Sequence, residues 1–345
     1  MYIFLGVLVR KIRHLYTLIA FINLSLLLSF IHAAEPNMLL EKMNNSLQSS
    51  SEIILSMDKA YTAGEITIAV TSALGNILVC VAVARDRRLW TVTNCFLVSL
   101  SVADVCVGAF AIPCAILTSI GIPQHNLELC LLMLSVLIML TMSSTFSLLA
   151  ISVDRYIAIL NPLRYKSIMT STNTLILIIT GWIVAFLSGL MPLMGWHKPP
   201  PSHGYCIFTH VIDMTYLVYF FSFVYFYLPV IIMATIYTKI YSAVKRQLHG
   251  TVVGSHHGVV GKQGAGMKEL KNGYFSLYNH FLFMLCWAPL HIMNGVSLLC
   301  PNCYIPPVIL EIGIILTHAN SALNPVIYVY KLKSFRNTFK NVLPV

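Results

Sequence analysis

The sequence predicts an all-α membrane protein, a seven-transmembrane helix bundle followed by a short amphipathic eighth helix. Three observations predict it: the composition, seven long apolar runs, and basic residues gathered on one side. Of the 345 residues, 57% are apolar and only 10% are charged, whereas a soluble domain carries about 25% charged residues. So few charged residues cannot cover a globule with polar surface, which disfavours a soluble enzyme.

The seven runs are each long enough for a helix that crosses a bilayer, which needs about 20 apolar residues. They do not alternate in polarity as the strands of a membrane barrel do. In order, the runs are Ile66–Ala84, Thr91–Pro123, Leu129–Val153, Thr172–Trp196, Met214–Thr238, Gly273–Leu299 and Tyr304–Tyr330. Between the fifth and sixth runs, the stretch 250–266 is rich in glycine and predicts a flexible loop.

The net charge of +10 has a simple source in the connecting segments. Three loops on one side contain a single basic residue, Lys198, and the other segments hold Arg85, Arg87, Arg88, Arg155, Arg164, Lys166, Lys239, Lys245, Arg246, Lys262, Lys268, Lys271, Lys331, Lys333, Arg336 and Lys340. The positive-inside rule therefore places the C-terminus in the cytoplasm and the N-terminus outside, with the protein in the plasma membrane. Membrane lipid explains the charge, and nucleic acid is not needed as a partner.

Three segments are expected. Residues 1–60 form an N-terminal segment in which basic residues precede the apolar stretch 15–31 and the small residues 33–34, a pattern typical of a signal peptide. An uncleaved helix, or a later start at Met43 or Met57, is the alternative. Asn44 begins a glycosylation sequon. Residues 61–331 form the bundle, and residues 332–345 form an amphipathic tail with Leu332 and Phe335 on its apolar face.

Short motifs mark the ends and depths of these spans. Asp154-Arg155-Tyr156 closes the third span, and Cys130 opens it. The stretch between Cys130 and Asp154 measures about 37 Å at 1.5 Å per residue, so the two lie at opposite membrane surfaces. Asn324-Pro325-Val326-Ile327-Tyr328 closes the seventh span, and Cys286-Trp287-Ala288-Pro289 lies in the sixth. Each proline removes a helical hydrogen bond and creates a deformable point.

In this order and at these depths, the motifs resemble those of the rhodopsin-like G-protein-coupled receptors over residues 60–341. The resemblance implies that Arg155 holds the inactive state through Asp154 and Glu269. It also implies that the sixth helix swings outward on activation, and that a heterotrimeric G protein then binds. The switch residues would be Asp154, Arg155, Tyr156, Tyr237, Glu269, Pro325 and Tyr328. A sodium ion, the only cofactor that the resemblance suggests, would be held by Asp104, Ser144, Asn320 and Asn324; a carboxylate at mid-membrane needs such a partner or hydrogen bonds.

The polar residues near the outer end indicate the ligand chemistry. Leu137 occupies the position at which amine receptors carry a carboxylate, and His318 the position at which opsins carry a lysine. In the sixth span Trp287, Leu290, His291 and Asn294 share a helical face. In the seventh, Ile314, Thr317 and His318 do the same. Together with the ring of Phe208 in the outer loop, these groups suit a flat, neutral heterocycle that bears a sugar, since an amide can pair with an adenine edge.

Residues 286–294 (CWAPLHIMN), 316–321 (LTHANS) and 75–80 (GNILVC) closely resemble those of the adenosine receptors. The resemblance implies that Asn294 hydrogen-bonds the purine, that Phe208 stacks on it, and that Thr317, His318 and Thr141 bind the ribose. Glu65 would orient His318, and Trp287 would form the floor. The apolar walls would be Leu137, Ile138, Leu290 and Ile314. The resemblance also implies disulfides between Cys130 and Cys206 and between Cys300 and Cys303.

Four residues depart from the family's pattern at this pocket: Thr209, Phe221, Met142 and Glu311. They leave a second interpretation open, a related receptor whose pocket has drifted to another purine or small apolar ligand. A transporter or channel is the alternative of another class, although no inverted repeat is visible. We expect a receptor for adenosine and not an enzyme, since no catalytic pair, phosphate loop or metal quartet is present. Lys268-Glu269-Leu270-Lys271 and Leu316-Thr317-His318 resemble the inhibitory subtypes of the family more than the stimulatory ones, and this resemblance implies coupling that lowers cAMP. Dimerisation stays open.

Overall fold

The structure is a computed structural model that describes residues 47–201, 204–253, 260–300, 302–331 and 335. At 47–58, 244–253, 260–279 and 330–331 only the backbone is described. The predicted signal peptide, the sequon at Asn44 and nearly all of the predicted tail at 332–345 therefore lie outside the described residues, as does the side chain of Glu269.

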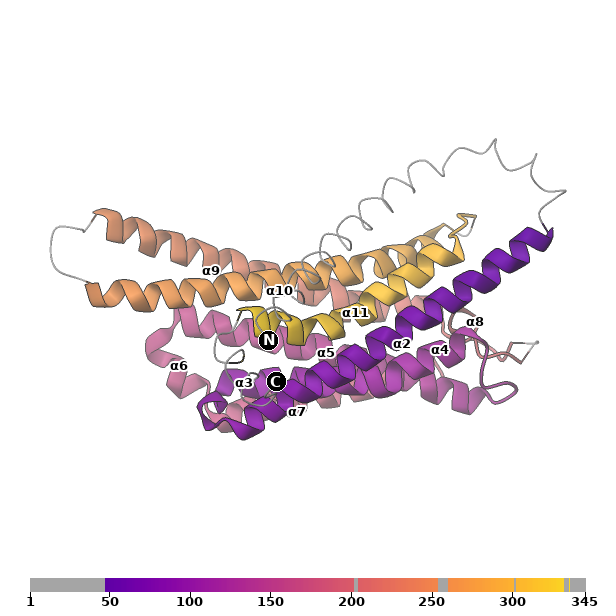
Figure 1. Cartoon of the computed structure of the whole chain (residues 1–345), viewed down its shortest axis with the longest axis horizontal. Coiled ribbons are helices and arrows are strands. Elements are labelled where there is room, and N and C mark those ends of the chain that lie inside the picture. The colour runs from indigo at the N-terminus through magenta and orange to yellow at the C-terminus, as the bar shows by residue number, and fades with distance from the viewer. Residues whose placement is uncertain (1–46, 202–203, 254–259, 301, 332–334, 336–345) are drawn as a thin grey trace, which may run out of the picture.

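Helices account for almost all of the described chain, and the predicted seven-helix bundle is confirmed (Figure 1). The long helices are α2 (Leu47–Arg85), α3 (Val92–Cys106), α5 (Leu127–Leu160), α7 (Ser171–Gly189), α9 (Leu228–Val253), α10 (Val260–Leu299) and α11 (Pro307–Lys331). Two stretches are π-helix. The first, η2 (Val107–Ala111), joins α3 to α4 (Ile112–Ser119), and the second, η3 (Tyr216–Tyr227), precedes α9. Shorter elements are η1 (Arg87–Leu89), α6 (Pro162–Ile168) and α8 (Phe208–Val211).

Among the described residues, seven helical stretches are long and apolar enough to cross a membrane: Lys59–Arg85, Val92–Ser119, Leu127–Leu160, Ser171–Gly189, Tyr216–Ala243, His280–Leu299 and Pro307–Val329. Their starts follow local chemistry. Thr91, Asn126 and Thr170 each accept a hydrogen bond from the backbone N–H three residues further on, which satisfies a donor that the helix leaves free. Pro162 and Pro307 begin α6 and α11, where the missing N–H costs nothing.

Three helices extend beyond the apolar runs from which they are predicted. Helix α2 begins at Leu47, well before the expected boundary at residue 61, and its membrane-length part begins at Lys59. Helices α9 and α10 also extend into the glycine-rich stretch 250–266, to Val253 and from Val260. Glycine weakens a helix by only about 1 kcal/mol relative to alanine. The backbone hydrogen bonds of α9 and α10 can therefore continue at glycines such as Gly250 and Gly261.

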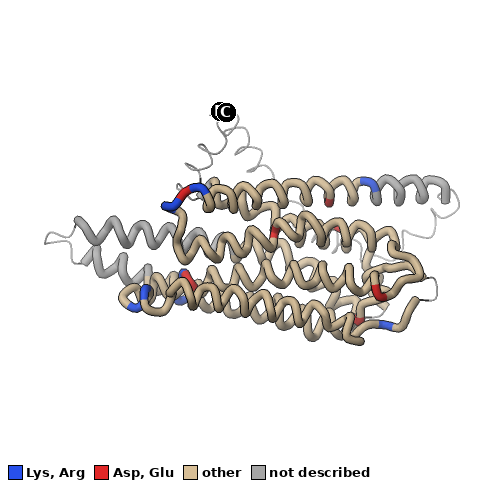
Figure 2. Tube along the Cα trace, turned by 90° about the horizontal axis from the view of Figure 1, so that it is seen from below, with Lys and Arg blue, Asp and Glu red and all other residues tan. Residues whose placement is uncertain are grey.

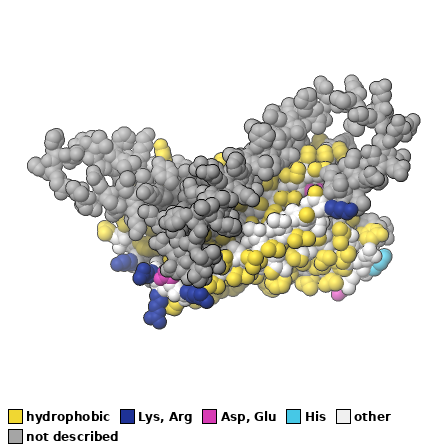
Figure 3. Space-filling model, in the orientation of Figure 1, with side chains coloured by type: hydrophobic (Ala, Val, Ile, Leu, Met, Phe, Trp, Pro, Cys, Tyr) yellow, Lys and Arg dark blue, Asp and Glu magenta, His cyan; other side chains and the backbone are white. Residues whose placement is uncertain are grey.

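The central helix is α5, which contacts α3, α7, α9 and α10, while α2 packs between α3 and α11. Gly108 in η2 permits the close approach of α2, because a Cβ at this position would lie 2.6 Å from the carbonyl oxygen of Ala69. The outer surface stays apolar: Leu175, Ile179 and Phe186 on α7 are about half exposed. Figure 3 shows hydrophobic side chains along one face of the bundle, with Lys and Arg at its ends, as a lipid-facing surface requires.

Basic residues of the described part gather at one end of the bundle (Figure 2). Arg85, Arg87 and Arg88 lie there with Arg164 and Lys166, at the ends of α2, η1 and α6. We call this the inner end, and the opposite end, which carries the Cys130–Cys206 disulfide, the outer end. The names follow the predicted orientation.

Candidate ligand site and switch residues

On α10 the predicted face points into the bundle. Trp287, His291 and Asn294 are 6%, 1% and 8% exposed, whereas Ile292, on the opposite side of the same turn, is 59% exposed. Pro289 lies within the helix without ending it. The 3.6-residue period therefore places an indole, an imidazole and an amide along one buried stripe near the outer end.

His291 is enclosed by aromatic rings and held by a residue that sequence reasoning missed. Its ring stacks on Phe226 at 4.4 Å and on Trp287 at 5.7 Å. Its Nδ1 lies 2.7 Å from the hydroxyl of Ser222, and that hydroxyl also lies 2.8 Å from the carbonyl oxygen of Leu217. Since the serine hydroxyl has one proton, which it donates to Leu217, Nδ1 donates to Ser222. No described residue partners Nε2, which is left as a buried acceptor.

The π-helix explains why Ser222 contacts His291. Phe221, one of the four residues that depart from the family's pattern, packs its ring against Tyr225 and His291. In η3 the wider turn changes which side chains face α10, and Ser222 is 1% exposed. Such π-bulges are frequent at functional sites. A run of aromatic residues gives no periodicity from which the bulge could be read.

Helices α11 and α2 share a buried, hydrogen-bonded pair of side chains. Nδ1 of His318 donates to both carboxylate oxygens of Glu65, at 2.8 and 3.0 Å, and the side chains are 3% and 0% exposed. An ionised carboxylate only accepts hydrogen bonds, so the proton on Nδ1 is fixed and Nε2 is the nitrogen left to face another group. Thr317, one residue earlier, is also buried.

Two hydroxyls predicted to bind the ribose are turned toward their own helices. Thr141 on α5 donates to the carbonyl oxygens of Leu137 and Ile138, at 3.0 and 2.8 Å. Thr317 donates to the carbonyl oxygen of Ile314 at 2.7 Å. Each hydroxyl keeps two acceptor lone pairs, so both can receive hydrogen bonds from the hydroxyls of a ligand. The predicted walls differ in exposure: Ile138 is buried, and Leu137, Leu290 and Ile314 are half-buried.

At the outer end, Cys130 bonds to Cys206, and Cys300 bonds to Cys303, so both predicted disulfides are present. Phe208 begins α8 two residues after Cys206 and packs, half-buried, against the core. A cavity of about 210 Å³ lies beside the disulfide, lined by first-loop and second-loop residues such as His125 and Tyr205. Neither Asn294 nor Phe208 lines it, so this cavity is distinct from the predicted purine contacts.

At mid-bundle, Asp104 is fully buried and its two carboxylate oxygens face different helices. Ser144 donates to one oxygen at 2.9 Å, and the amide of Asn324 donates to the other at 2.7 Å. Asn320 is 5% exposed. Carboxylate, hydroxyl and amide oxygens are ligands that a hard cation prefers, so this donor set fits the predicted sodium ion.

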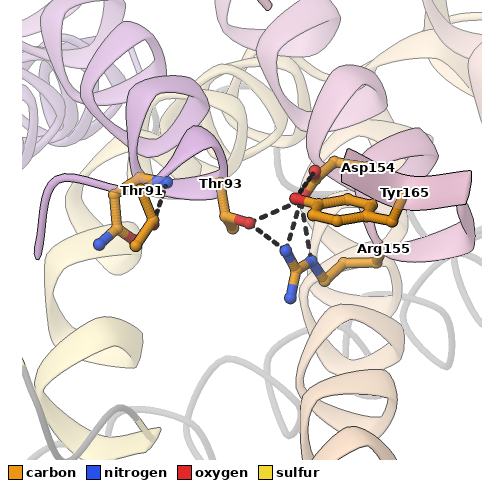
Figure 4. Close-up of polar contacts among 6 residues, drawn as sticks. Thr91, Thr93, Asp154, Arg155 and Tyr165 are labelled. Carbon is orange, nitrogen blue, oxygen red and sulfur yellow. Dashed lines mark hydrogen bonds and ion pairs between the residues drawn. The ribbon is translucent and has the colours of Figure 1, made fainter. Parts of the chain in front are cut away.

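At the inner end, Asp154 connects three helices (Figure 4). Thr93 on α3 and Tyr165 on α6 each donate to its carboxylate at 2.8 Å, and Arg155 donates from Nε at 3.0 Å. Arg155 also donates to Thr93. Burial raises the pKa of the Tyr165 hydroxyl, so the hydroxyl stays protonated and keeps donating at physiological pH. Asp154 thus holds Arg155 at the α3 side.

The remaining switch residues lie on α5, α9 and α11. The ring of Tyr156 lies 6.0 Å below the ammonium of Lys239. Tyr237 on α9 contacts Ser152 through its hydroxyl, at 2.7 Å. Pro325 and Tyr328 on α11 are buried, and the Tyr328 ring lies 6.0 Å from that of Phe335. The predicted contact between Arg155 and Glu269 lies outside the described side chains.

A seven-helix bundle with a buried polar stripe at one end and a held arginine at the other defines a membrane receptor. The protein family described as "7 transmembrane receptor (rhodopsin family)" matches this chain over residues 75–328. Adenosine receptor A2b of Gallus gallus is 41% identical over 309 residues, 83% of this chain and 89% of the relative. Adenosine receptor A2a of Canis lupus familiaris and that of Homo sapiens are each 38% identical over 301 residues, 82% of this chain and 72% of each relative.

The chain therefore belongs to the rhodopsin-like G-protein-coupled receptors and, within them, to the adenosine receptor family. It is a multi-pass membrane protein of the plasma membrane and not an enzyme. The recognition made from residues 286–294 and 316–321 is confirmed, as is the fold. The roles of the individual site residues stay predictions.

Proposed function

We propose that this chain is a receptor for extracellular adenosine or a close purine nucleoside and that it activates a heterotrimeric G protein. Membership of the adenosine receptor family supports the ligand class. The observation that carries the proposal is the burial of two recognition groups inside the bundle: the amide of Asn294 on α10 and the His318–Glu65 pair on α11 and α2.

The purine would pair with Asn294, because an amide offers a donor and an acceptor side by side, as an adenine edge requires. Phe208 would cover the purine ring. The ribose hydroxyls would donate to Thr141 and Thr317, whose own protons are used within their helices. Nε2 of His318 would complete the sugar contacts, since Glu65 holds the other ring nitrogen.

Signalling would follow from a shift in population between a closed and an open arrangement of α10. His291 stacks on Trp287 and on Phe226 of η3, the element that precedes α9, so a ligand that moves this stack would change how α10 packs. At the inner end, Arg155 would leave Asp154 and Thr93 to contact the G protein. Asp104 and Ser144 would hold a sodium ion that favours the closed arrangement.

For orientation and coupling we propose an outer N-terminus and a cytoplasmic C-terminus. Inhibitory coupling stays a hypothesis that rests on short sequence strings, and the similarity to A2a and A2b receptors gives it no support. The test is second-messenger output in transfected cells given adenosine. A change in cAMP that adenosine deaminase abolishes supports the proposal, and its sign gives the coupling; no response at saturating adenosine, with the receptor at the surface, contradicts it.

A further inference from the structure

In the inner half of the bundle, three polar side chains from three helices meet in apolar surroundings. Ser152 on α5, Tyr237 on α9 and His280 on α10 are 2%, 5% and 7% exposed. The Ser152 and Tyr237 hydroxyls lie 2.7 Å apart, and the rings of Tyr237 and His280 lie 5.5 Å apart. Burying a polar group costs free energy unless the group is hydrogen-bonded. Each polar atom of these three side chains is therefore expected to have a hydrogen-bond partner.

One atom of the cluster lacks a partner. Among the described residues, none hydrogen-bonds Nδ1 of His280, which is buried. The three side chains line a small cavity, with about 10 Å³ open to a water-sized sphere. The other side chains that line it are apolar: Leu148, Ile151, Met233 and Phe283. A space of about 10–15 Å³ is what one water molecule needs, together with two to four polar partners.

We propose that this cavity is a binding site for one water molecule, which links Nδ1 of His280 to the Ser152–Tyr237 hydroxyl pair. The water completes a hydrogen-bonded bridge that holds α10 against α5 and α9 in the closed arrangement. His280 is the residue that makes the bridge reach α10, because the hydrogen bond between Ser152 and Tyr237 joins α5 to α9.

The bridge gives the inner end a second restraint, separate from the contacts of Arg155. Tyr237 is occupied by Ser152 in this arrangement, so it is withheld from the role in G-protein binding predicted for it. Opening α10 would remove His280 from the water and break the bridge. The inference rests on the proposed outward movement of α10 and does not depend on which ligand the receptor binds.

The test uses four single variants of the full-length receptor and the double variant that combines His280→Leu with Ser152→Ala, at matched surface expression, in membranes treated with adenosine deaminase. His280→Leu removes the ring nitrogen and Ser152→Ala removes the hydroxyl. His280→Asn keeps a polar atom at the Nδ1 position. Met233→Leu changes an apolar side chain that lines the same cavity. The measurement is ligand-independent binding of a non-hydrolysable GTP analogue.

We expect His280→Leu and Ser152→Ala each to raise basal G-protein activation about two- to tenfold, the range for loss of one buried hydrogen bond. His280→Asn and Met233→Leu should keep the wild-type level. The double variant should rise no further than the larger single variant, because both changes break one bridge. Unchanged or lower basal activity in His280→Leu would overturn the inference, since it would mean that His280 only packs.

A second measurement addresses the water directly. A high-resolution structure of the ligand-free receptor should show ordered density between His280 and the Tyr237 hydroxyl, and an empty cavity would overturn the assignment even if activity changed. Failure of the adenosine proposal is a different result: adenosine would produce no response, while the basal changes in these variants would remain.

Discussion

The buried pair between Glu65 and His318 allows a quantitative prediction for Glu65→Gln. The glutamine keeps the shape of the side chain and one acceptor, but it removes the negative charge that lies 2.8 Å from Nδ1. Hydrogen bonds to charged groups contribute about 1.5–3 kcal/mol, and with 0% and 3% exposure little of this is lost to solvent screening. If the imidazole must be held to bind the ribose, affinity for adenosine should fall about ten- to a hundredfold.

The assay is competition binding by adenosine in membranes that carry equal amounts of receptor, with Glu128→Gln as control. Glu128 is an exposed acid in the first turn of α5, so its neutralisation should leave the affinity unchanged. For a ligand that lacks the 2′- and 3′-hydroxyls, the difference in affinity between Glu65→Gln and wild type should be smaller than it is for adenosine. Equal adenosine affinity for Glu65→Gln and wild type would refute the role of the pair in ligand binding.

Three further outcomes are expected. Ser222→Ala leaves Nδ1 of His291 without its partner, so affinity should fall about three- to tenfold in competition binding, the loss expected for one neutral hydrogen bond. Cys130→Ser opens the bond to Cys206, which closes a long loop with a sequence separation of 76; unfolding should become easier by about 2–5 kcal/mol, seen as a lower melting temperature in detergent. Asp104→Asn removes the carboxylate of the predicted sodium site, so agonist affinity should no longer respond to sodium chloride.

Each of these has a matched control. Ser242→Ala removes an exposed serine hydroxyl that bonds only its own helix and should leave ligand affinity as it is; an equal loss in both serine variants would show that Ser222 acts only through stability. Free Cys95 is exposed, so Cys95→Ser should not shift the melting temperature, and a shift equal to that of Cys130→Ser would argue against the disulfide. For Asp104→Asn the control is potassium chloride on the wild-type receptor. If potassium chloride changes agonist affinity as much as sodium chloride does, the response reflects ionic strength and not a sodium site at Asp104.

The bundle was predictable because its signals are local. Runs of about twenty apolar residues set the spans, capping residues such as Thr91 and Asn126 set helix starts, and the 3.6-residue period placed His291 and Asn294 on one buried face. The disulfides and the contact of Glu65 with His318 came from the resemblance to a family. Spacing alone could not have paired Glu65 with His318, which lie 253 positions apart in the sequence.

What could not be predicted depends on irregular backbone. The π-helix at Tyr216–Tyr227 brings Ser222 to His291, and the twelve-residue stretch is aromatic at so many positions that no face is marked. For that reason the sequence drew attention to Phe221 and passed over Ser222. The bridge at His280 was missed for another reason: a single histidine in an apolar run is more often a packed core residue, and only the three-helix arrangement shows its neighbours.

The central claim is that an amide high on α10 recognises a purine. Saturation binding of a radiolabelled adenosine agonist to Asn294→Ala tests it most directly, with Ile292→Ala, on the lipid-facing side of the same helix, as control. We predict at least about a tenfold loss of affinity for Asn294→Ala, because a bidentate pair and its selectivity disappear together, and no change for Ile292→Ala. Adenosine binding to Asn294→Ala with wild-type affinity would contradict the assignment of the purine site.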